Sequence, residues 1–339
     1  MDLRPSQEQT QLVEAFAAMY GKSCSPGEVA DGEHEGHHPA LWVQVQQMGA
    51  VEMAVDDGAT LLDLVLVAEQ HGRHIAPAPM IEAQVAARLL SAVGGPLAEE
   101  ALASLLAGDE LITIALRPPV GGIAGLVPAG AVADRAIVAS GDRLLLVNLD
   151  GTSTPVSNTG GLPLADVAVP SDAHEIANGH DALLHFALAL DEWRVLTAAA
   201  LQGLAARALE IGVEYVKERK AFGQPIGAFQ AVAHRLADRA AEVDGAELLI
   251  REAAWSFDAE PLRAPELAAM ALAFAAETAR DTTYFALHFH GGYGFMLEYP
   301  IQAYFRRART WSAILENPAT SFQLVAERRA LRVAKEAAK

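Results

Sequence analysis

The sequence has only one cysteine, Cys24, among its 339 residues. A single cysteine cannot form a disulfide within the chain, and sparse cysteine is typical of proteins in a reducing compartment. The first twenty residues also lack the basic stretch followed by an apolar run that marks a signal peptide. We therefore expect a cytoplasmic protein with no disulfide framework.

Basic residues are scarce, because 25 Lys and Arg stand against 43 Asp and Glu, a formal net charge of -18. Nucleic-acid binding depends on clustered basic side chains that release counterions, so we expect no nucleic-acid partner. Long uncharged runs are missing as well. Apolar stretches such as 61–68 meet a charge well before the roughly 20 residues that a membrane span needs, so we expect no membrane-spanning segment.

The sequence does have enough apolar residues, 52% against 20% charged, for a sizeable packed core. Helical periodicity dominates residues 1–108, where Ser6 is placed to cap the first helix, and it returns from 179 to 339. Residues 109–178 instead carry short β-branched runs between Pro, Gly, Asn and Thr. These runs are 111–116, 135–140 and 143–149. The predicted fold class is mainly α with a small β domain.

The C-terminal segment predicts an antiparallel four-helix bundle. One helix leads into Arg219, a second starts near Val232, and a third covers 267–288. The last opens at Asn317, an N-cap residue followed by a proline in the first turn.

Two groups of histidines call for interpretation. A polar, glycine-broken loop supplies no fixed geometry for a metal, so we predict no metal site at His34, His37 and His38. His71 and His74 flank the end of a predicted helix, where cations suit the helix dipole. Capping is therefore favoured over catalysis for this second pair.

The corner between two bundle helices, residues 219–238, carries the first functional motif. The helical pattern stops on both sides of a turn made by Gly223, Pro225 and Gly227. Arg219 can bind a phosphate bidentately, and the ring of Phe222, three residues later, can pack against a flat ligand. On its own the pattern R-x-x-F-G is weak support for a binding site.

A glycine turn, H-F-H-G-G-Y-G-F at 288–295, carries the second motif. Its three glycines let a backbone approach a phosphate or a base more closely than any side chain would permit. A helix C-cap followed by an ordinary turn explains the same residues. For either motif alone, the structural explanation is favoured over a binding site.

Together, in this order within a helical half-chain, the two motifs resemble the acyl-CoA dehydrogenase family, and the resemblance covers most of the chain. V-A-E-Q-H-G-R at 67–73 and A-P-A-P at 76–79 are similar to the N-terminal pattern of that family. The resemblance implies the acyl-CoA dehydrogenase fold, with an N-terminal helical domain (1–108), a truncated middle β domain (109–178) and a C-terminal four-helix bundle (179–339). It also implies a flavoprotein that desaturates acyl-CoA thioesters.

The middle domain departs from the family pattern. Family members hold the flavin ring there with a Thr-Glu-Pro and Gly-Ser-Asp type segment and a tryptophan. Both features are missing, since the tryptophans of this chain are Trp42, Trp193, Trp255 and Trp311. We infer that the chain does not seat an isoalloxazine ring on its own β domain.

The positions of the catalytic glutamate also differ from the family pattern. Desaturation needs a carboxylate that removes the α-proton of the thioester. Family members place this glutamate at one of two positions. The first position holds Leu315 in this chain, and Glu316 follows it by one residue. The second holds Trp193, and Glu192 precedes it by one residue on the same helix, about 100° around the axis. We expect no catalytic residue in this chain and keep Glu316 as the fallback base.

The resemblance does carry over to the other half of the cofactor site. In the family's tetramers, a neighbouring subunit contacts the adenosine and pyrophosphate of each FAD. The matching residues are Arg219 for the pyrophosphate arginine, Phe222 for the adjacent ring, Phe229 and Gln230 for the start of the return helix, His288 in place of a glutamine, and Gly291 and Gly292 for the glycine pair.

This combination is similar to the short subunit of α2β2 acyl-CoA dehydrogenases that desaturate CoA esters of steroid (cholesterol) side chains. A longer partner subunit would then supply the glutamate, the ring pocket and the acyl tunnel, with FAD shared across the interface. Two alternatives remain open: a self-sufficient homotetrameric acyl-CoA dehydrogenase with Glu316 as base, and a flavin-free binding or scaffold paralogue.

Overall fold

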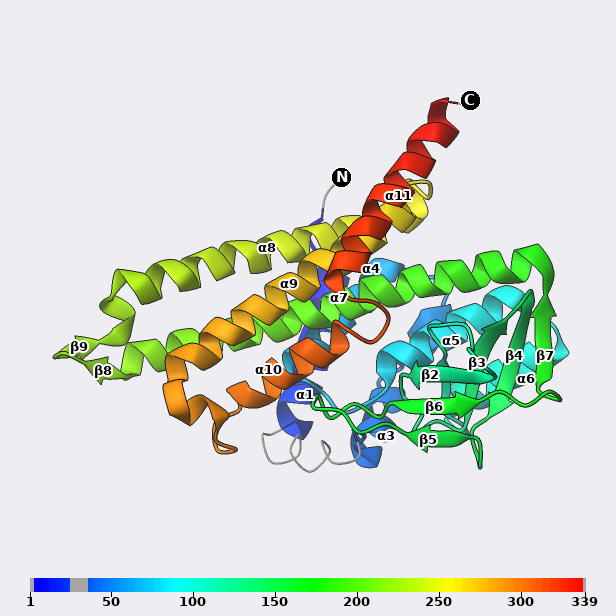
Figure 1. Ribbon diagram of the computed structural model, residues 1–339, viewed down its shortest axis with the longest axis horizontal. Coiled ribbons are helices and arrows are strands. Elements are labelled where there is room, and N and C mark those ends of the chain that lie inside the picture. The colour runs from blue at the N-terminus through cyan, green and yellow to red at the C-terminus, as the bar shows by residue number, and fades with distance from the viewer. Residues whose placement is uncertain (1–2, 25–35, 338–339) are drawn as a thin grey trace. The chain divides into compact units, whose positions relative to one another are not determined.

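The computed structural model describes residues 3–24 and 36–337, so that His34 lies outside the described residues. The described chain divides into two compact units (Figure 1). A helical unit contains residues 3–24, 65–76 and 194–337, and a mixed unit contains residues 36–64 and 77–193. The predicted fold class, mainly α with a small β part, is confirmed. The predicted domain limits at 108 and 178 stay a prediction.

The mixed unit contains short helices and two small sheets. Its elements are α3 (Pro39–Gln47), the 3-10 helix η1 (Glu52–Val55), α5 (Met80–Val93), α6 (Pro96–Ala107), β1 (Ile112–Ile114), β2 (Ile123–Val127), β3 (Arg135–Ser140), β4 (Arg143–Asn148), β5 (Ser153–Pro155), β6 (Ala165–Ala168) and β7 (His174–Asn178). Helices α4 (Leu61–Arg73) and α7 (Gly179–Glu218) begin in this unit and continue into the helical unit.

One sheet has the strand order β1-β3-β4-β7 and the other β2-β6-β5. Strand β1 runs parallel to β3, and the remaining neighbours are antiparallel. Strands β3 and β4 form a tight hairpin in which Ser140 pairs with Arg143 and Gly141 adopts a φ of 66°. Alternate apolar residues of both sheets share one core, among them Val127, Val138 and Val167. The three β-branched runs in the sequence correspond to β1, β3 and β4, as predicted.

The helical unit is built from long helices. Besides the ends of α4 and α7 it contains α1 (Gln7–Ser23), the short hairpin β8 (Lys220–Ala221) and β9 (Gln224–Pro225), η2 (Ile226–Ala228), α8 (Gln230–Ala259), α9 (Ala264–His290), η3 (Gly291–Phe295), α10 (Ile301–Trp311) and α11 (Pro318–Ala337). The predicted cap of α1 is confirmed. Ser6 Oγ accepts from the backbone N–H of Gln9 at 3.1 Å, and the Gln9 side chain accepts from the N–H of Ser6 at 2.9 Å.

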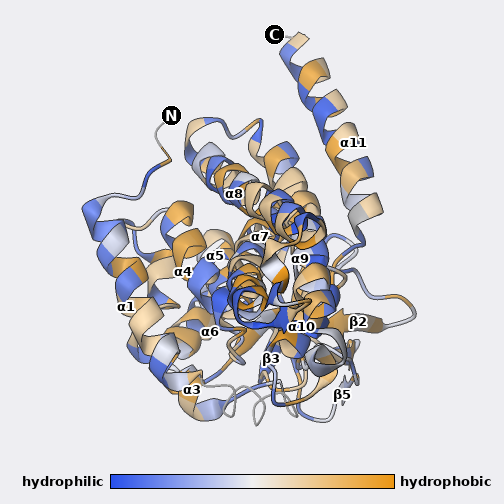
Figure 2. Ribbon diagram, turned by 90° about the vertical axis from the view of Figure 1, so that its left-hand side faces the viewer, coloured by the Kyte–Doolittle hydropathy of each residue, from blue (hydrophilic) through white to orange (hydrophobic). Residues whose placement is uncertain are grey.

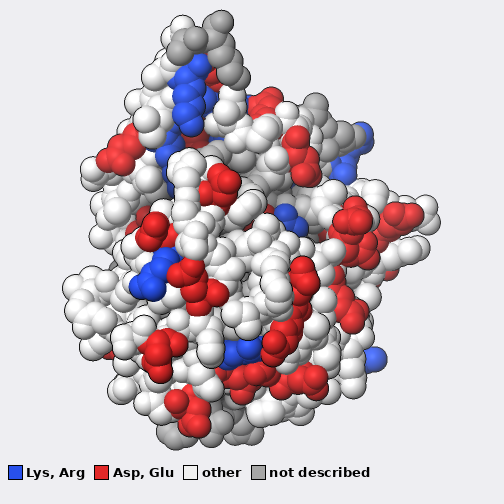
Figure 3. Space-filling view, turned by 90° about the vertical axis from the view of Figure 1, so that its right-hand side faces the viewer, with Lys and Arg blue, Asp and Glu red and all other residues white. Residues whose placement is uncertain are grey.

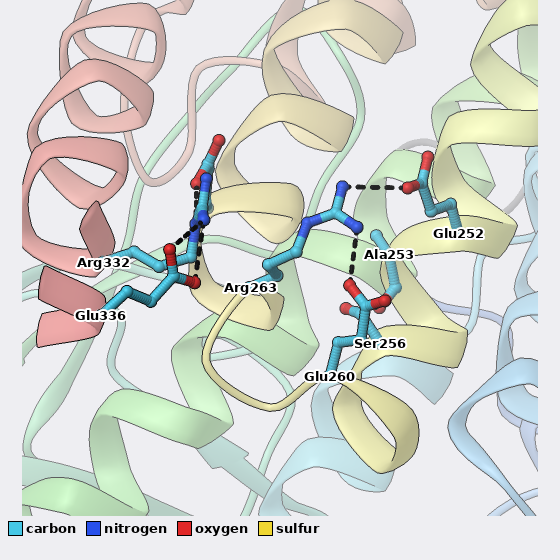
Figure 4. Close-up of polar contacts among 8 residues, drawn as sticks. Glu252, Ala253, Ser256, Glu260, Arg263, Arg332 and Glu336 are labelled. Carbon is cyan, nitrogen blue, oxygen red and sulfur yellow. Dashed lines mark hydrogen bonds and ion pairs between the residues drawn. The ribbon is translucent and has the colours of Figure 1, made fainter. Parts of the chain in front are cut away.

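Ion pairs connect α8 to α9 across their turn and connect α11 to α9 (Figure 4). Arg263 bridges Glu252 at 3.1 Å and Glu260 at 2.6 Å, which ties the start of α9 to the end of α8. Arg332 of α11 pairs with Glu266 of α9 at 2.8 Å. Most of these side chains are partly exposed, so we expect them to fix the packing of the helices more than to add large stability.

Helix α7 is long and apolar. It is the one described helix that could cross a membrane by length and composition, with a mean hydropathy of 1.2 over its most apolar 18 residues, of which 78% are buried inside the protein. Figure 2 shows hydrophobic residues along α7 and its neighbour α9. A buried core helix passes the same test, so the window is explained by packing.

Helices α4 and α7 approach so closely that side chains are excluded from the contact. A Cβ at Gly72 would lie 1.8 Å from the backbone oxygen of Ala200, and one at Gly203 would lie 1.9 Å from the backbone oxygen of Glu69. Real Cβ atoms never come so near to backbone atoms. Glycine is therefore required at both positions for this backbone contact.

The end of α4 corrects the interpretation of His71. The side chain is 2% exposed, and its Nδ1 lies 3.2 Å from the hydroxyl oxygen of Tyr20, beside the ring of Trp311. Burial, and then the nearby charge of Arg307, lower the pKa of His71 to about 3. His71 is thus a neutral core residue, and its predicted role as a capping cation is wrong. His74 does contact a helix-end carbonyl, since its Nδ1 lies 2.9 Å from the backbone oxygen of Gln70.

The buried His71 makes stability depend on pH. Its pKa is lowered in the folded state, so from about pH 6.5 down towards pH 3 only the unfolded chain binds the extra proton. We expect this residue to contribute less stability as pH falls, approaching about 1.4 kcal/mol per pH unit. Urea unfolding of the wild type and of His71→Gln, which keeps a hydrogen-bond acceptor for Tyr20, measures the effect as a difference.

That difference should shift in favour of His71→Gln as the pH is lowered. Glu69 acts in the opposite direction, because burial raises the pKa of its carboxyl to about 7, but it is present in both proteins and cancels. A difference that stays constant between pH 7 and pH 4 would show that His71 is not neutral in the folded protein.

Candidate functional site

The predicted corner is a two-residue β-hairpin between α7 and α8. Lys220 pairs with Pro225 and Ala221 with Gln224, and the backbone oxygen of Arg219 accepts from the N–H of Ile226 at 2.8 Å. The turn is made by Phe222 and Gly223, with φ values of 53° and 85°. Two consecutive positive φ angles are typical of the type I′ hairpin turn, which favours glycine.

Phe222 stands at the tip of this hairpin in a backbone conformation that is strained for a bulky residue. Its side chain is 95% exposed, and its ring lies perpendicular to that of Phe229, with ring centroids 6.1 Å apart. Phe229 precedes α8, which begins at the exposed Gln230. An aromatic ring held in water at a strained position is available for contact with another molecule.

The glycine turn lies where α9 ends. Gly291 has φ 61° and ψ -138°, a combination open to glycine alone, and both Gly291 and Gly292 have open space where a Cβ would point. Gly294 is buried against the backbone oxygen of Leu287. His288 is exposed on the last turn of α9 and stacks on Tyr284, with centroids 5.9 Å apart.

An aromatic cluster brings the corner and the glycine turn together. The guanidinium carbon of Arg219 lies 6.0 Å from the centre of the Tyr293 ring. Behind it, Tyr215 stacks on His290 at 3.9 Å, and Tyr299 packs its edge against both rings. The sequence analysis missed this cluster. Its signal was the tyrosines in and beside the two motifs, in E-Y-V before Arg219 and in G-Y-G and E-Y-P after the third helix.

Arg219 differs from most arginines of the chain in its partners. Others, such as Arg73, Arg88 and Arg194, pair with carboxylates. Within residues 3–24 and 36–337, Arg219 pairs with none, and Tyr293 is the partner of its exposed guanidinium. Acidic side chains also outnumber basic ones on the face in Figure 3. An arginine without a counter-ion in so acidic a protein is suited to bind an anionic group.

The surface beside the glycine turn is apolar. After Tyr293, which is 47% exposed, come Phe295 at 68%, Met296 at 44% and Leu297 at 85%. Large side chains exposed side by side in this way mark a contact surface more often than a solvated one. The site therefore combines a cation, open backbone glycines and exposed rings, a set that fits a phosphate joined to a flat heterocycle.

The two candidate glutamates lie elsewhere, in ion pairs. Glu316 accepts from Nε of Arg194 at 3.3 Å and from the hydroxyl of Ser321 at 3.0 Å, and both members of the ion pair are largely buried. Glu192 is 3% exposed and pairs with Arg88 at 2.8 Å. Each carboxylate is held by a guanidinium in an ion pair, which favours a structural role.

Trp193 and the histidines complete the list of sequence candidates. Trp193 is 1% exposed, and its Nε1 has no hydrogen-bond partner in the part of the chain that the structure describes. The described residues also contain no group of three or more His, Cys, Asp or Glu that could hold a metal. His38 instead caps α3, accepting from the N–H of Leu41 at 3.2 Å.

Comparison with known proteins defines the class. The family model described as "Acyl-CoA dehydrogenase, C-terminal domain" matches residues 185–315. Acyl-CoA dehydrogenase IpdE2 of Mycolicibacterium smegmatis is 31% identical over 321 residues, which cover 92% of this chain and 96% of the relative. The chain therefore belongs to the acyl-CoA dehydrogenase family, and the predicted enzyme class is confirmed.

Solved structures agree on the fold. The ChsE4-ChsE5 complex from Mycobacterium tuberculosis matches with a TM-score of 0.88 at 24% identity, covering 97% of this chain and 99% of the other. A variant of the Tcur3481-Tcur3483 steroid acyl-CoA dehydrogenase matches with a TM-score of 0.87 at 25% identity, covering 98% and 99%. The predicted acyl-CoA dehydrogenase fold is confirmed, as is the resemblance to steroid acyl-CoA dehydrogenases.

The environment of Glu316 predicts a structural effect of its replacement. In Glu316→Gln the hydrogen bond from Ser321 can remain, but the largely buried ion pair with Arg194 is lost. We expect a loss of about 2 kcal/mol in the free energy of unfolding, measured by urea denaturation. Glu327→Gln, on the exposed side of α11, is the control and should change stability little. Unchanged stability of Glu316→Gln would contradict the structural role.

Proposed function

We propose that this chain is a subunit of an FAD-dependent acyl-CoA dehydrogenase and completes the FAD site of a longer catalytic partner. The observation that carries the proposal is an asymmetry. Arg219 meets the glycine turn at an exposed surface, whereas Leu315 and Trp193 occupy the two glutamate positions of the family. One half of a cofactor site is kept and the catalytic half is replaced.

The kept residues fit the nucleotide end of FAD. Arg219 would bind the pyrophosphate, with Gly291 and Gly292 allowing the backbone to approach it. The exposed ring of Phe222, next to Phe229 and Gln230, would pack against the adenosine. His288 would donate a hydrogen bond in place of the family's glutamine. When bound, FAD supplies the acceptor for the hydride that leaves the β-carbon.

The partner would supply the other half of the reaction. A glutamate of the longer subunit would remove the α-proton of the thioester, and its ring pocket and acyl tunnel would hold the flavin ring and the substrate. The apolar surface at Phe295 and Leu297 lies beside Arg219 and Tyr293 and would be covered at this interface. The assembly we propose is an α2β2 heterotetramer in the cytoplasm, with no nucleic-acid or membrane partner.

The proposed substrate is the CoA ester of a steroid side chain, such as that of cholesterol. Its support is the similarity of the whole chain to the Tcur3481-Tcur3483 steroid acyl-CoA dehydrogenase. The support for a heteromer is the similarity to one chain of the ChsE4-ChsE5 complex. The reaction class, α,β-desaturation of an acyl-CoA thioester, follows from the family.

Flavin counting tests the subunit proposal. The chain is purified alone and after co-expression with the longer acyl-CoA dehydrogenase, and flavin absorbance is measured per polypeptide. We expect little flavin in the isolated chain and half as many flavins as polypeptides in the active complex. A full complement with turnover in the isolated chain would support the homotetramer with Glu316 as base. A complex that forms but contains no flavin and shows no dehydrogenase activity would support the scaffold alternative.

Variants of Arg219 test its role within the complex. Removing a bidentate, charge-assisted contact costs about 1.5 to 3 kcal/mol, so Arg219→Ala should weaken FAD binding roughly 10- to 100-fold. Arg219→Lys keeps the positive charge but cannot form the two parallel hydrogen bonds of a guanidinium. Its affinity for FAD should therefore lie between those of the wild type and Arg219→Ala. Arg329→Ala, an exposed arginine on α11, is the matched control and should retain wild-type flavin. Equal retention by all the variants would remove Arg219 from the site.

A further inference from the structure

A continuous set of aromatic rings connects the end of α9 to Arg219. Tyr215 lies one helical turn before Arg219, whose backbone N–H donates to the Tyr215 carbonyl at 2.9 Å. The ring of Tyr215 stacks on His290, with centroids 3.9 Å apart, and Tyr299 lies nearly perpendicular to both rings. Tyr293 follows, 5.8 Å from Tyr299 between centroids, and the guanidinium carbon of Arg219 lies over the Tyr293 ring.

This set of rings is anchored to the last turn of α9. His290 is 4% exposed, and its Nδ1 lies 2.7 Å from the backbone oxygen of Ala286. Gly294, the neighbour of Tyr293, is buried, and a Cβ there would lie 2.7 Å from the backbone oxygen of Leu287. The backbone that carries Tyr293 is therefore packed directly against α9, which fixes the base of the Tyr293 ring.

An aromatic ring can orient a guanidinium without neutralising it. The ring attracts a cation through its quadrupole and adds no negative charge, whereas a carboxylate would cancel the charge and take up hydrogen-bond donors. Exposed carboxylates are near in the sequence, with Glu218 directly before Arg219 and Glu298 directly before Tyr299. In the described ranges Arg219 nevertheless has no carboxylate partner. Its charge and its donors therefore remain available for an anionic ligand.

We propose that Tyr293 is a positioning residue of the FAD site, whose ring holds the guanidinium of Arg219 towards the pyrophosphate and away from the neighbouring carboxylates. This role rests on the proposed function, because the pyrophosphate is the group that Arg219 would bind there. Tyr293 acts through Arg219, in contrast to Phe222, whose ring would contact the adenosine itself. The face of the Tyr293 ring performs the role, so its hydroxyl is not required.

Titration of FAD into the deflavinated complex of the two subunits, followed by flavin fluorescence, tests this role. Tyr293→Phe keeps the ring and should bind FAD as the wild type does. Tyr293→Leu removes the ring and should weaken binding about 2- to 5-fold, the effect of losing an exposed cation–π contact. Tyr293→Glu should weaken binding more than Tyr293→Leu, because its carboxylate would compete with the pyrophosphate for Arg219. Phe322→Leu, at a 43% exposed aromatic residue on α11, is the matched control and should bind as the wild type does.

A double-mutant cycle separates positioning from direct contact. In the Arg219→Ala complex the ring has no guanidinium to hold, so Tyr293→Leu should cause no further loss of affinity. An equal loss in both backgrounds would mean that Tyr293 contacts FAD or supports the local fold, and would overturn the positioning role. Wild-type affinity of Tyr293→Leu would overturn it too, as would a loss in Tyr293→Phe as large as that in Tyr293→Leu.

The same measurements distinguish failure of this role from failure of the proposed function. Full FAD affinity in Arg219→Ala would contradict the proposed cofactor site, and the role of Tyr293 with it. Weakened binding in Arg219→Ala together with wild-type affinity in Tyr293→Leu would contradict the role of Tyr293 alone. Thermal unfolding of each complex verifies that the variants are folded.

Discussion

The contact between α4 and α7 is the constraint on which the helical unit depends. Two backbones meet there without side chains, because a Cβ at Gly72 or Gly203 would lie within 2 Å of the opposite backbone. The direction of α7 is thereby fixed relative to α4. The direction of α7 sets the position in space of its C-terminal end, which carries Tyr215 and is followed by Arg219. The cationic corner is therefore positioned by the helix contact at Gly203, 16 residues earlier in the chain.

Features set by neighbouring residues could be predicted from the sequence. The capping box at Ser6 needs only residues three apart, and the break after Arg219 follows from Gly223 and Pro225. Strands β3 and β4 match their β-branched runs at both ends to within a residue, because the turn between them is short and contains Gly141. Local patterns do not show which turn binds a ligand. That prediction came from the resemblance of the two motifs to the family.

Features set by contacts between distant residues could not be predicted in this way. His71 looks like a helix-end cation in the sequence, and its burial by Tyr20 and Trp311 makes it neutral. The ion pair of Glu316 with Arg194 joins residues 122 apart, and no local pattern marks it. The positive φ of Phe222 is likewise invisible, because bulky residues rarely adopt it. Motifs thus located the candidate site, whereas the structure gave the partners of each side chain.

The row of side chains from Tyr293 to Leu297 has a consequence for how the protein is made in the cell. Phe295 and Leu297 place most of their surface in water, next to the ring of Tyr293. Apolar surface of this kind drives association with whatever apolar surface is nearest. On the proposed assembly, a copy synthesised without its companion would keep this surface uncovered and would aggregate more readily than the complex. Balanced production of the two polypeptides, for instance from one transcript, would then be a condition for obtaining soluble enzyme.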